Sequence, residues 1–205
     1  MTPRRAPARL VVLASGNGSN LQAILDACAS GVLPARVTHV VSDRPTSGAL
    51  RRAERANGVT AVACPRHDDE PREEFDERLA RIVTRANPDW VVLAGWMRVL
   101  SMRFLGRFPG RVVNLHPALP GELPGLHAIE RAFDEHRAGQ RTATGVMVHL
   151  VPDEGVDDGP VLASTTVPIE PDDTLESLTA RIHDTEHRLL VRTLATLCSP
   201  EEALR

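Results

Sequence analysis

The chain contains no lysine: all 24 of its permanently basic residues are arginine. A Walker A phosphate loop needs its lysine, and an enzyme that forms a Schiff base needs a lysine amine, so the sequence excludes both kinds of site. A preference for arginine over lysine is explained most simply by genome composition. The absence of lysine therefore reduces the number of possible functions without indicating a particular one.

Cysteine is also scarce. The three cysteines, Cys28, Cys64 and Cys198, are odd in number and far apart in the sequence. This spacing provides neither a disulfide framework nor a paired-cysteine metal knuckle. We therefore expect a protein of the reducing cytoplasm.

Long hydrophobic runs are missing as well. The first apolar run, from Leu10 to Ala14, is shorter than the hydrophobic region of a secretion signal, and no stretch approaches the length of a membrane span. We expect residues 1–8 to form a loose basic tail before the first strand. The formal net charge of -3 gives no electrostatic reason to expect nucleic acid or an anionic membrane as a partner.

What the sequence does contain is a regular alternation of β-rich apolar runs and helical stretches. The 205 residues, 42% of them hydrophobic, are enough for one sizeable core, so we expect a single domain over 1–205. Alternation of this kind predicts an α/β fold with a mostly parallel sheet covered on both faces, followed by an antiparallel pair. The expected strands cover 9–14, 36–42, 59–64, 89–95, 111–116, 142–151 and 160–169, and the expected helices cover 20–30, 47–57, 72–86, about 125–138 and 174–197.

The segment SGNGSN (15–20) lies between the first strand and its helix, where α/β proteins often bind anions. Glycine lets backbone N–H groups approach a phosphate, and the helix N-terminus adds positive potential. It is not a dinucleotide fingerprint, because Leu21 stands where a third glycine is needed. Asp43, at the end of the second strand, still leaves an NAD site open. The structural alternative is a plain turn with Ser19 or Asn20 as the helix N-cap.

The segment HDTEH (183–187) matches the H-x-x-E-H zinc pattern, with two histidines four residues apart on a helix. Two imidazoles could bind the metal while Glu186 activated water. The sequence offers no third ligand, however. A solvated helix face is the favoured interpretation of this segment.

The segment VVNLHPALPG (112–121) ends a buried strand with two polar residues. Since side chains on a strand alternate, Asn114 and His116 point to the same side of the sheet. The acidic turn DEGVDDGP (153–160) would complement them if it lay over the end of this strand. A carboxylate there would raise the histidine pKa, and Asn114 with a protonated His116 could then stabilise an oxyanion. A hydrogen-bonded turn is the structural alternative.

Four segments occur in an order that marks a known family: SGNGSN, VVLAGWMRVLS, NLHPALPG with PGLH, and H-L-V with D-x-G-P. From about Leu10 to the last helix the chain resembles the phosphoribosylglycinamide formyltransferases, which are folate-dependent formyltransferases. The resemblance implies a single-domain, Rossmann-like formyltransferase fold. It also implies transfer of the formyl group of 10-formyltetrahydrofolate to the amine of glycinamide ribonucleotide in purine (IMP) biosynthesis, without a metal.

The resemblance assigns roles residue by residue. Its catalytic positions are Asn114, His116 and Asp157; its substrate-binding positions are Gly18, Ser19, Asn20 and Glu186; its folate-binding positions are Arg72, Met97, Arg98, Val99, Leu100 and Val151. The implied mechanism has Asn114 and protonated His116 donating to the oxyanion of a tetrahedral intermediate, with Asp157 keeping His116 charged. Glu186 at the ribose explains HDTEH without zinc.

Some alternatives stay open. The spacing from His149 to Asp157 is one residue longer than is usual for the family, so Asp158 remains a candidate beside Asp157, and His149 has no assigned role. Methionyl-tRNA formyltransferase and formyltetrahydrofolate deformylase share the Asn-x-His-Pro element, but they normally carry an extra domain. A non-catalytic nucleotide-binding module would use only the SGNGSN loop. A homodimer is compatible with the sequence.

Overall fold

The computed structural model describes residues 6–199, as seven strands and six helices. The strands are β1 (Ala8–Leu13), β2 (Ala35–Ser42), β3 (Thr60–Ala63), β4 (Trp90–Leu93), β5 (Val112–His116), β6 (Ala143–Leu150) and β7 (Val161–Pro168). The helices are α1 (Ser19–Ala29), α2 (Gly48–Arg55), α3 (Arg72–Arg85), α4 (Met102–Leu105), α5 (Ala128–Arg137) and α6 (Leu175–Cys198).

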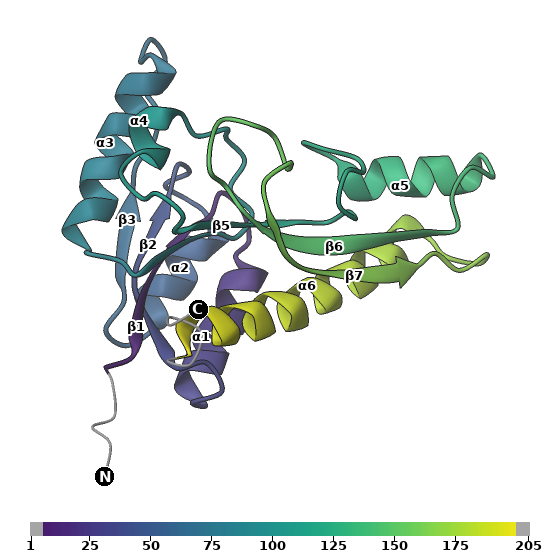
Figure 1. The fold of residues 1–205 in the computed structure, drawn as a ribbon, viewed down its shortest axis with the longest axis horizontal. Coiled ribbons are helices and arrows are strands. Elements are labelled where there is room, and N and C mark those ends of the chain that lie inside the picture. The colour runs from purple at the N-terminus through teal and green to yellow at the C-terminus, as the bar shows by residue number, and fades with distance from the viewer. Residues whose placement is uncertain (1–5, 200–205) are drawn as a thin grey trace.

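All seven strands belong to one sheet, in the order β3-β2-β1-β4-β5-β6-β7 (Figure 1). The first five strands in this order pair in parallel, and β6 and β7 continue the sheet in antiparallel fashion. The sheet is therefore mostly parallel with an antiparallel C-terminal extension, as predicted. Figure 1 shows this extension, with α5 beside it, projecting away from α3 and α4.

Two apolar cores lie on opposite faces of the sheet, because successive strand residues face opposite ways. In β1, Leu10 and Val12 join the core covered by α1, α2, α5 and α6, whereas Val11 and Leu13 join the core covered by α3 and α4. All four side chains are fully buried. This two-sided burial explains why the parallel strands are continuous apolar runs rather than alternating ones.

Helix α6 links the two ends of the chain, since it packs against α1 and also against β6 and β7. Its N-terminus is fixed by a capping box, in which Thr174 and Ser177 each accept the other's backbone N–H. Within residues 6–199, no helix is both long enough and apolar enough to cross a membrane.

Every predicted element is present, with ends within about three residues of those expected. Helix α4 was not predicted, because four residues are too short to show a helical period. The expected tail is too long by at least one residue, since Ala8 already belongs to β1; its residues 1–5 lie outside the described part of the chain.

Candidate active site

One cavity of about 600 Å³ opens where the carboxyl ends of β1, β4 and β5 meet the turn between β6 and β7. In open α/β sheets, ligands bind in just such a crevice. All the predicted site residues line it except Arg72. The cavity therefore brings together motifs that are far apart in the sequence, as the family resemblance implied.

Asn114 and His116 lie on the same side of β5 and both line this cavity, which confirms the orientation expected from strand alternation. The antiparallel pairing of β5 with β6 sets Asn114 opposite His149. His149 is buried, and it becomes the fourth polar side chain of the centre. The sequence could not assign it this position, because the register of strand pairing was unknown.

The acidic turn does lie over the end of β5. One oxygen of Asp157 accepts from Asn114 Nδ2 at 2.9 Å, and the other lies 3.2 Å from His116 Nδ1. The second oxygen also accepts from the backbone N–H of Gly125 at 2.8 Å. Asp158 is exposed instead, so it is Asp157 that reaches the histidine. Asp157 has φ 56°, a left-handed conformation that suits aspartate better than most residues.

Both amide hydrogens of Asn114 are already in use. Its Nδ2 lies 2.9 Å from Asp157 Oδ1 and 3.1 Å from His149 Nε2. His149 Nδ1 faces the carbonyl oxygen of Leu150 at 2.9 Å, which accepts only, so a neutral His149 carries its proton on Nδ1 and accepts at Nε2. An oxyanion must therefore take the place of one of these acceptors before Asn114 can donate to it.

His116 is held from both sides. Its Nδ1 faces Asp157, and its Nε2 lies 3.0 Å from the carbonyl oxygen of Leu123, in the loop after β5. Burial lowers the pKa of His116 below its usual value, although the Asp157 carboxylate and the Leu123 carbonyl both favour the charged form. Asp157 therefore acts on the pKa of His116 in the expected direction, but desolvation outweighs this contribution and leaves the pKa below its usual value.

The SGNGSN loop forms the other end of the cavity. Gly18 is the N-cap of α1 with φ 80°, and no side chain caps this helix, so the alternative with Ser19 or Asn20 as the cap was wrong. The first N–H groups of a helix have no partner within the helix. Here they remain available to an anion, and Asn20 is free to use its side chain elsewhere.

Asn20 Nδ2 donates to Glu186 Oε2 at 3.2 Å, which joins α1 to α6 at this end of the cavity. Burial raises the pKa of Glu186 to about 7, with only the Asn20 hydrogen bond acting against it. His183 lies 4.0 Å away on the same helix. Among the residues that the structure describes, no three His, Cys, Asp or Glu side chains are grouped to hold a metal ion.

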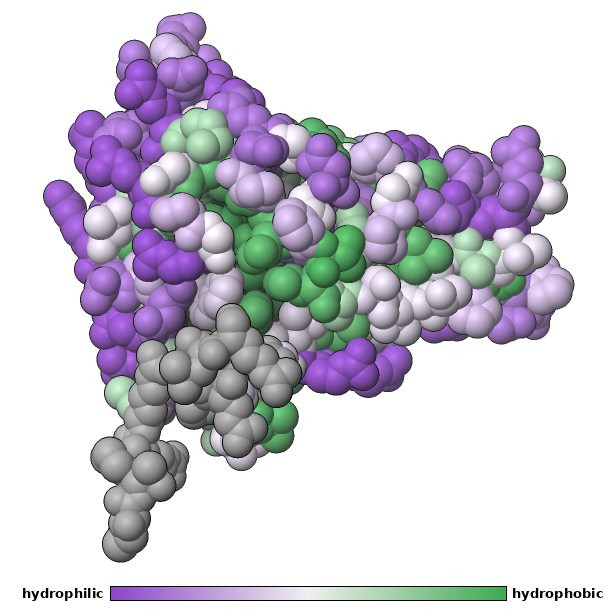
Figure 2. All heavy atoms as spheres, in the orientation of Figure 1, coloured by the Kyte–Doolittle hydropathy of each residue, from purple (hydrophilic) through white to green (hydrophobic). Residues whose placement is uncertain are grey.

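The remaining wall is apolar. The segment from Met97 to Leu100 and Val151 line this part of the cavity. Several large apolar side chains around the opening are exposed; they are Met97, Val99, Leu126 and Val156. Figure 2 shows hydrophobic residues gathered in the middle of one face of the molecule, with hydrophilic residues around them.

Asp43, which the NAD alternative would place at a ribose, does not line the cavity. Its buried carboxylate accepts from Arg98 Nε at 2.7 Å, and the Arg98 guanidinium also lies over the Phe75 ring. This pair fixes the direction of Arg98 within the cavity wall. The NAD alternative loses the acid on which it depended.

Arg72 lies outside the cavity lining. Its guanidinium pairs with Glu154, which also accepts the backbone N–H of Met102 at 3.0 Å. Glu154 belongs to the turn that carries Asp157, so it ties this turn to the start of α3 and of α4. Arg72 therefore reaches the site through Glu154 rather than by lining it.

Comparison with known proteins agrees with this geometry. The family model described as "Formyl transferase" matches residues 8–194. The phosphoribosylglycinamide formyltransferase of Mycobacterium tuberculosis H37Rv is 45% identical over 96% of this chain and 88% of its own. That of Dictyostelium discoideum is 41% identical over 92% and 97%. The crystal structure of phosphoribosylglycinamide formyltransferase from Bacillus halodurans superposes with a TM-score of 0.88, at 38% identity over 96% and 98%.

Proposed function

The chain belongs to the formyl transferase family, and from that premise we propose that it transfers the formyl group of 10-formyltetrahydrofolate to the amine of glycinamide ribonucleotide. The observation that supports this most is that one cavity brings together the Asn114, His116 and Asp157 cluster, the loop that we assign to the phosphate, and an apolar wall. A phosphorylated amine and a large aromatic formyl donor would approach the same polar centre from its two ends. The transfer belongs to the synthesis of purines.

At the loop end, we assign the substrate phosphate to the unpaired N–H groups around Gly18, Ser19 and Asn20. Glu186, next along the cavity, would accept from a ribose hydroxyl. Because its raised pKa keeps Glu186 largely protonated below neutral pH, it adds little negative charge beside the phosphate. The amine of the substrate then points toward β5.

At the other end, the apolar wall fits the folate. Exposed apolar side chains such as Met97 and Val99 would be covered by the flat pterin ring, which provides the hydrophobic contribution to binding. The backbone from Arg98 to Leu100, which lines the cavity together with Val151, offers polar groups for the ring edge. We assign Arg72, which lies outside the cavity lining and pairs with Glu154, to the part of the folate tail that leaves the cavity.

The centre performs the chemistry. The unprotonated amine attacks the formyl carbon, its lone pair forms the new C–N bond, and the carbonyl electrons move to oxygen. His116 Nε2 donates to that oxygen, and for this the loop must withdraw the Leu123 carbonyl that now occupies this nitrogen. Asn114 gives the second hydrogen bond. The oxyanion then re-forms the carbonyl group and the C–N bond to the folate nitrogen breaks. The proton lost by the attacking amine passes to the departing folate nitrogen, so the products are the formylated amine and tetrahydrofolate.

Asp157 has two tasks in this scheme. Its charge offsets part of the burial that lowers the pKa of His116, and so it helps the ring to hold a proton when the oxyanion forms. Its other oxygen holds Asn114 in place. Removal of one oxyanion donor costs roughly 10²–10³-fold in rate in other acyl-transfer sites.

The test follows folate product spectroscopically, with 10-formyltetrahydrofolate as donor and with or without glycinamide ribonucleotide. We expect turnover that requires the amine, survives EDTA, and falls roughly 10²–10³-fold or more in His116→Ala. His67→Ala, at an exposed histidine outside the cavity, is the matched control and should behave as wild type. Release of formate without the amine would instead indicate a deformylase, and no turnover at all would leave only a phosphate-binding module.

A further inference from the structure

The loop that we assign to the phosphate rests on helix α2, and the two are packed without spare room. A Cβ atom at Gly48 would lie 2.4 Å from the carbonyl oxygen of Asn17, and a Cβ at Gly18 would lie 2.8 Å from Ala49 Cα. Ala49 N also donates to the carbonyl oxygen of Gly16 at 3.2 Å. The start of α2 therefore acts as the floor of the loop.

Arg52, one turn further along α2, holds the same loop by its side chain. Its Nε donates to the Asn17 carbonyl oxygen at 3.0 Å, and one terminal nitrogen donates to Asn17 Oδ1 at 3.2 Å. The other terminal nitrogen donates to Gln22 on α1 at 3.1 Å. One planar guanidinium thus joins α2, the loop and α1, which a lysine ammonium has no geometry to do.

This contact sets the direction of a backbone N–H. A peptide unit is planar and trans, so its C=O and N–H point in opposite directions. Because the Asn17 carbonyl is held on the α2 side, the N–H of Gly18 points away from α2. Arg52 therefore fixes the orientation of the Gly18 N–H group, at the N-cap of α1, without lining the cavity itself.

Arg52 also carries charge to this place. Within residues 6–199 it forms no ion pair with a carboxylate, whereas many arginines of the chain do. The loop itself has no basic side chain. The Arg52 guanidinium, which contacts the loop from the α2 side, therefore supplies positive potential for an anion bound on the other side.

We propose that Arg52 is a positioning residue for the substrate phosphate. It fixes the Asn17–Gly18 peptide and adds positive potential on the side of the loop that faces α2. This rests on the proposed function, because it takes the loop to be the phosphate subsite. The contacts separate two contributions. Arg52→Lys keeps the positive charge but loses the planar guanidinium that makes several hydrogen bonds at once. Arg52→Met keeps most of the side-chain length but loses both the charge and these hydrogen bonds.

Steady-state kinetics with glycinamide ribonucleotide varied at saturating folate gives the first measurement. We expect KM to rise about 3–10-fold in Arg52→Lys and about 10–100-fold in Arg52→Met, the range for hydrogen bonds to a charged group, while kcat stays within about threefold. The KM for the folate should not change. Arg51→Met is the matched control, because Arg51 is exposed on the same helix and its guanidinium donates only to Thr46.

Calorimetric binding of inorganic phosphate gives the second measurement and needs no turnover. Weaker phosphate binding in Arg52→Met than in Arg51→Met supports the proposal. Equal phosphate binding and equal KM in these two variants, or a fall in kcat with KM unchanged, would overturn it. If wild type binds phosphate through Arg52 but transfers no formyl group, the proposed function fails while the role of Arg52 stands.

Discussion

At the scale of single residues, the centre is built from groups that each satisfy more than one neighbour. Asp157 contacts Asn114, His116 and a loop N–H, and Asn114 divides its two amide hydrogens between Asp157 and His149. Such a network holds its members in one geometry, so a change in any one of them disturbs the others. The oxyanion of the reaction has to displace acceptors that are already present.

Asp157→Asn tests the role of the carboxylate. Asparagine tolerates the left-handed backbone at this position, so the turn should persist, but the charge that opposes the lowered pKa of His116 is lost. We expect kcat to fall about 10²–10⁴-fold, as when an orienting carboxylate is removed from a catalytic histidine. Asp158→Asn, at the exposed neighbour, should stay near wild type. Similar losses in both variants would argue against a specific contact with His116.

Glu186→Gln tests the buried acid. Since the folded-state pKa, about 7, lies above the ordinary value of 4.5, ionisation is disfavoured by folding. The stabilisation from the protonated acid is fully present below about pH 4.5 and is lost as the pH rises through 7. We therefore expect Glu186→Gln to gain stability over wild type with rising pH, by up to about 3 kcal/mol at pH 8. Urea unfolding of both proteins at pH 5 and pH 8 measures this, and a constant difference would contradict the raised pKa.

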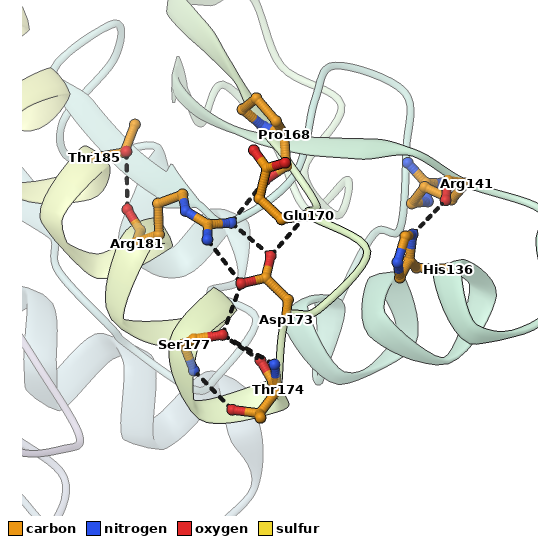
Figure 3. A network of polar contacts seen from close by, with 9 residues as sticks. All are labelled: His136, Arg141, Pro168, Glu170, Asp173, Thr174, Ser177, Arg181 and Thr185. Atoms are coloured by element: carbon orange, nitrogen blue, oxygen red, sulfur yellow. Dashed lines mark hydrogen bonds and ion pairs between the residues drawn. The ribbon is translucent and has the colours of Figure 1, made fainter.

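At the scale of elements, the first turn of α6 is tied to the chain before it. Figure 3 shows the Asp173 carboxylate between the guanidinium of Arg181 and the hydroxyl of Ser177. Both terminal nitrogens of Arg181 donate to it at 2.7 Å, and Glu170 donates its backbone N–H. These hydrogen bonds hold the pKa of Asp173 well below its usual range. These contacts therefore hold the N-terminal turn of α6, the helix that carries Glu186, in a fixed position.

Asp173→Asn should weaken this attachment. An amide keeps the shape of the side chain but cannot accept two charge-assisted bonds, so we expect a loss of about 1–3 kcal/mol at pH 7. Because the folded pKa is depressed, the contribution is present above the unfolded pKa near 4 and is lost as the pH falls through the folded value. Urea unfolding at pH 7 and pH 3 should show the gap to wild type narrowing in acid. Asp172→Asn, at the exposed neighbouring residue, is the control.

The elements were predictable because apolar periodicity depends on which face is buried. Strand alternation alone predicted that Asn114 and His116 share one side of β5, and the family resemblance predicted that this side faces the site. Three features of the site left no such trace in the sequence. The contact of His149 depends on strand register, the Leu123 carbonyl is a backbone group that any residue provides, and the lowered pKa of His116 depends on how far the whole fold buries it.

At the scale of the whole molecule, one sheet carries two cores that share no helix. Leu190 is fully buried in the core beneath α1 and α6, and Phe75 is buried in the core beneath α3. The cavity depends on both cores. Glu186 lies on α6, which covers the first core, and the segment with Met97 lies between Trp96 and Leu100 of the second core. A shared sheet should couple the two faces, because neither core can be lost without exposing the other side of the same strands.

We therefore predict a single domain with one cooperative unfolding transition, and the two tryptophans allow each face to be followed separately. Trp90 packs against the core of Leu190, and Trp96 belongs to the other core. In Trp96→Phe the remaining Trp90 reports the face with Leu190, and in Trp90→Phe the remaining Trp96 reports the opposite face. The urea unfolding curves of the two variants should coincide. Leu190→Ala leaves a cavity in one core and should lower the free energy of unfolding by about 2–5 kcal/mol. Because the common sheet couples the two cores, we expect the same loss in both tryptophan variants. A shift confined to the Trp90 signal would mean that the two faces unfold independently, and the single-domain prediction would fail.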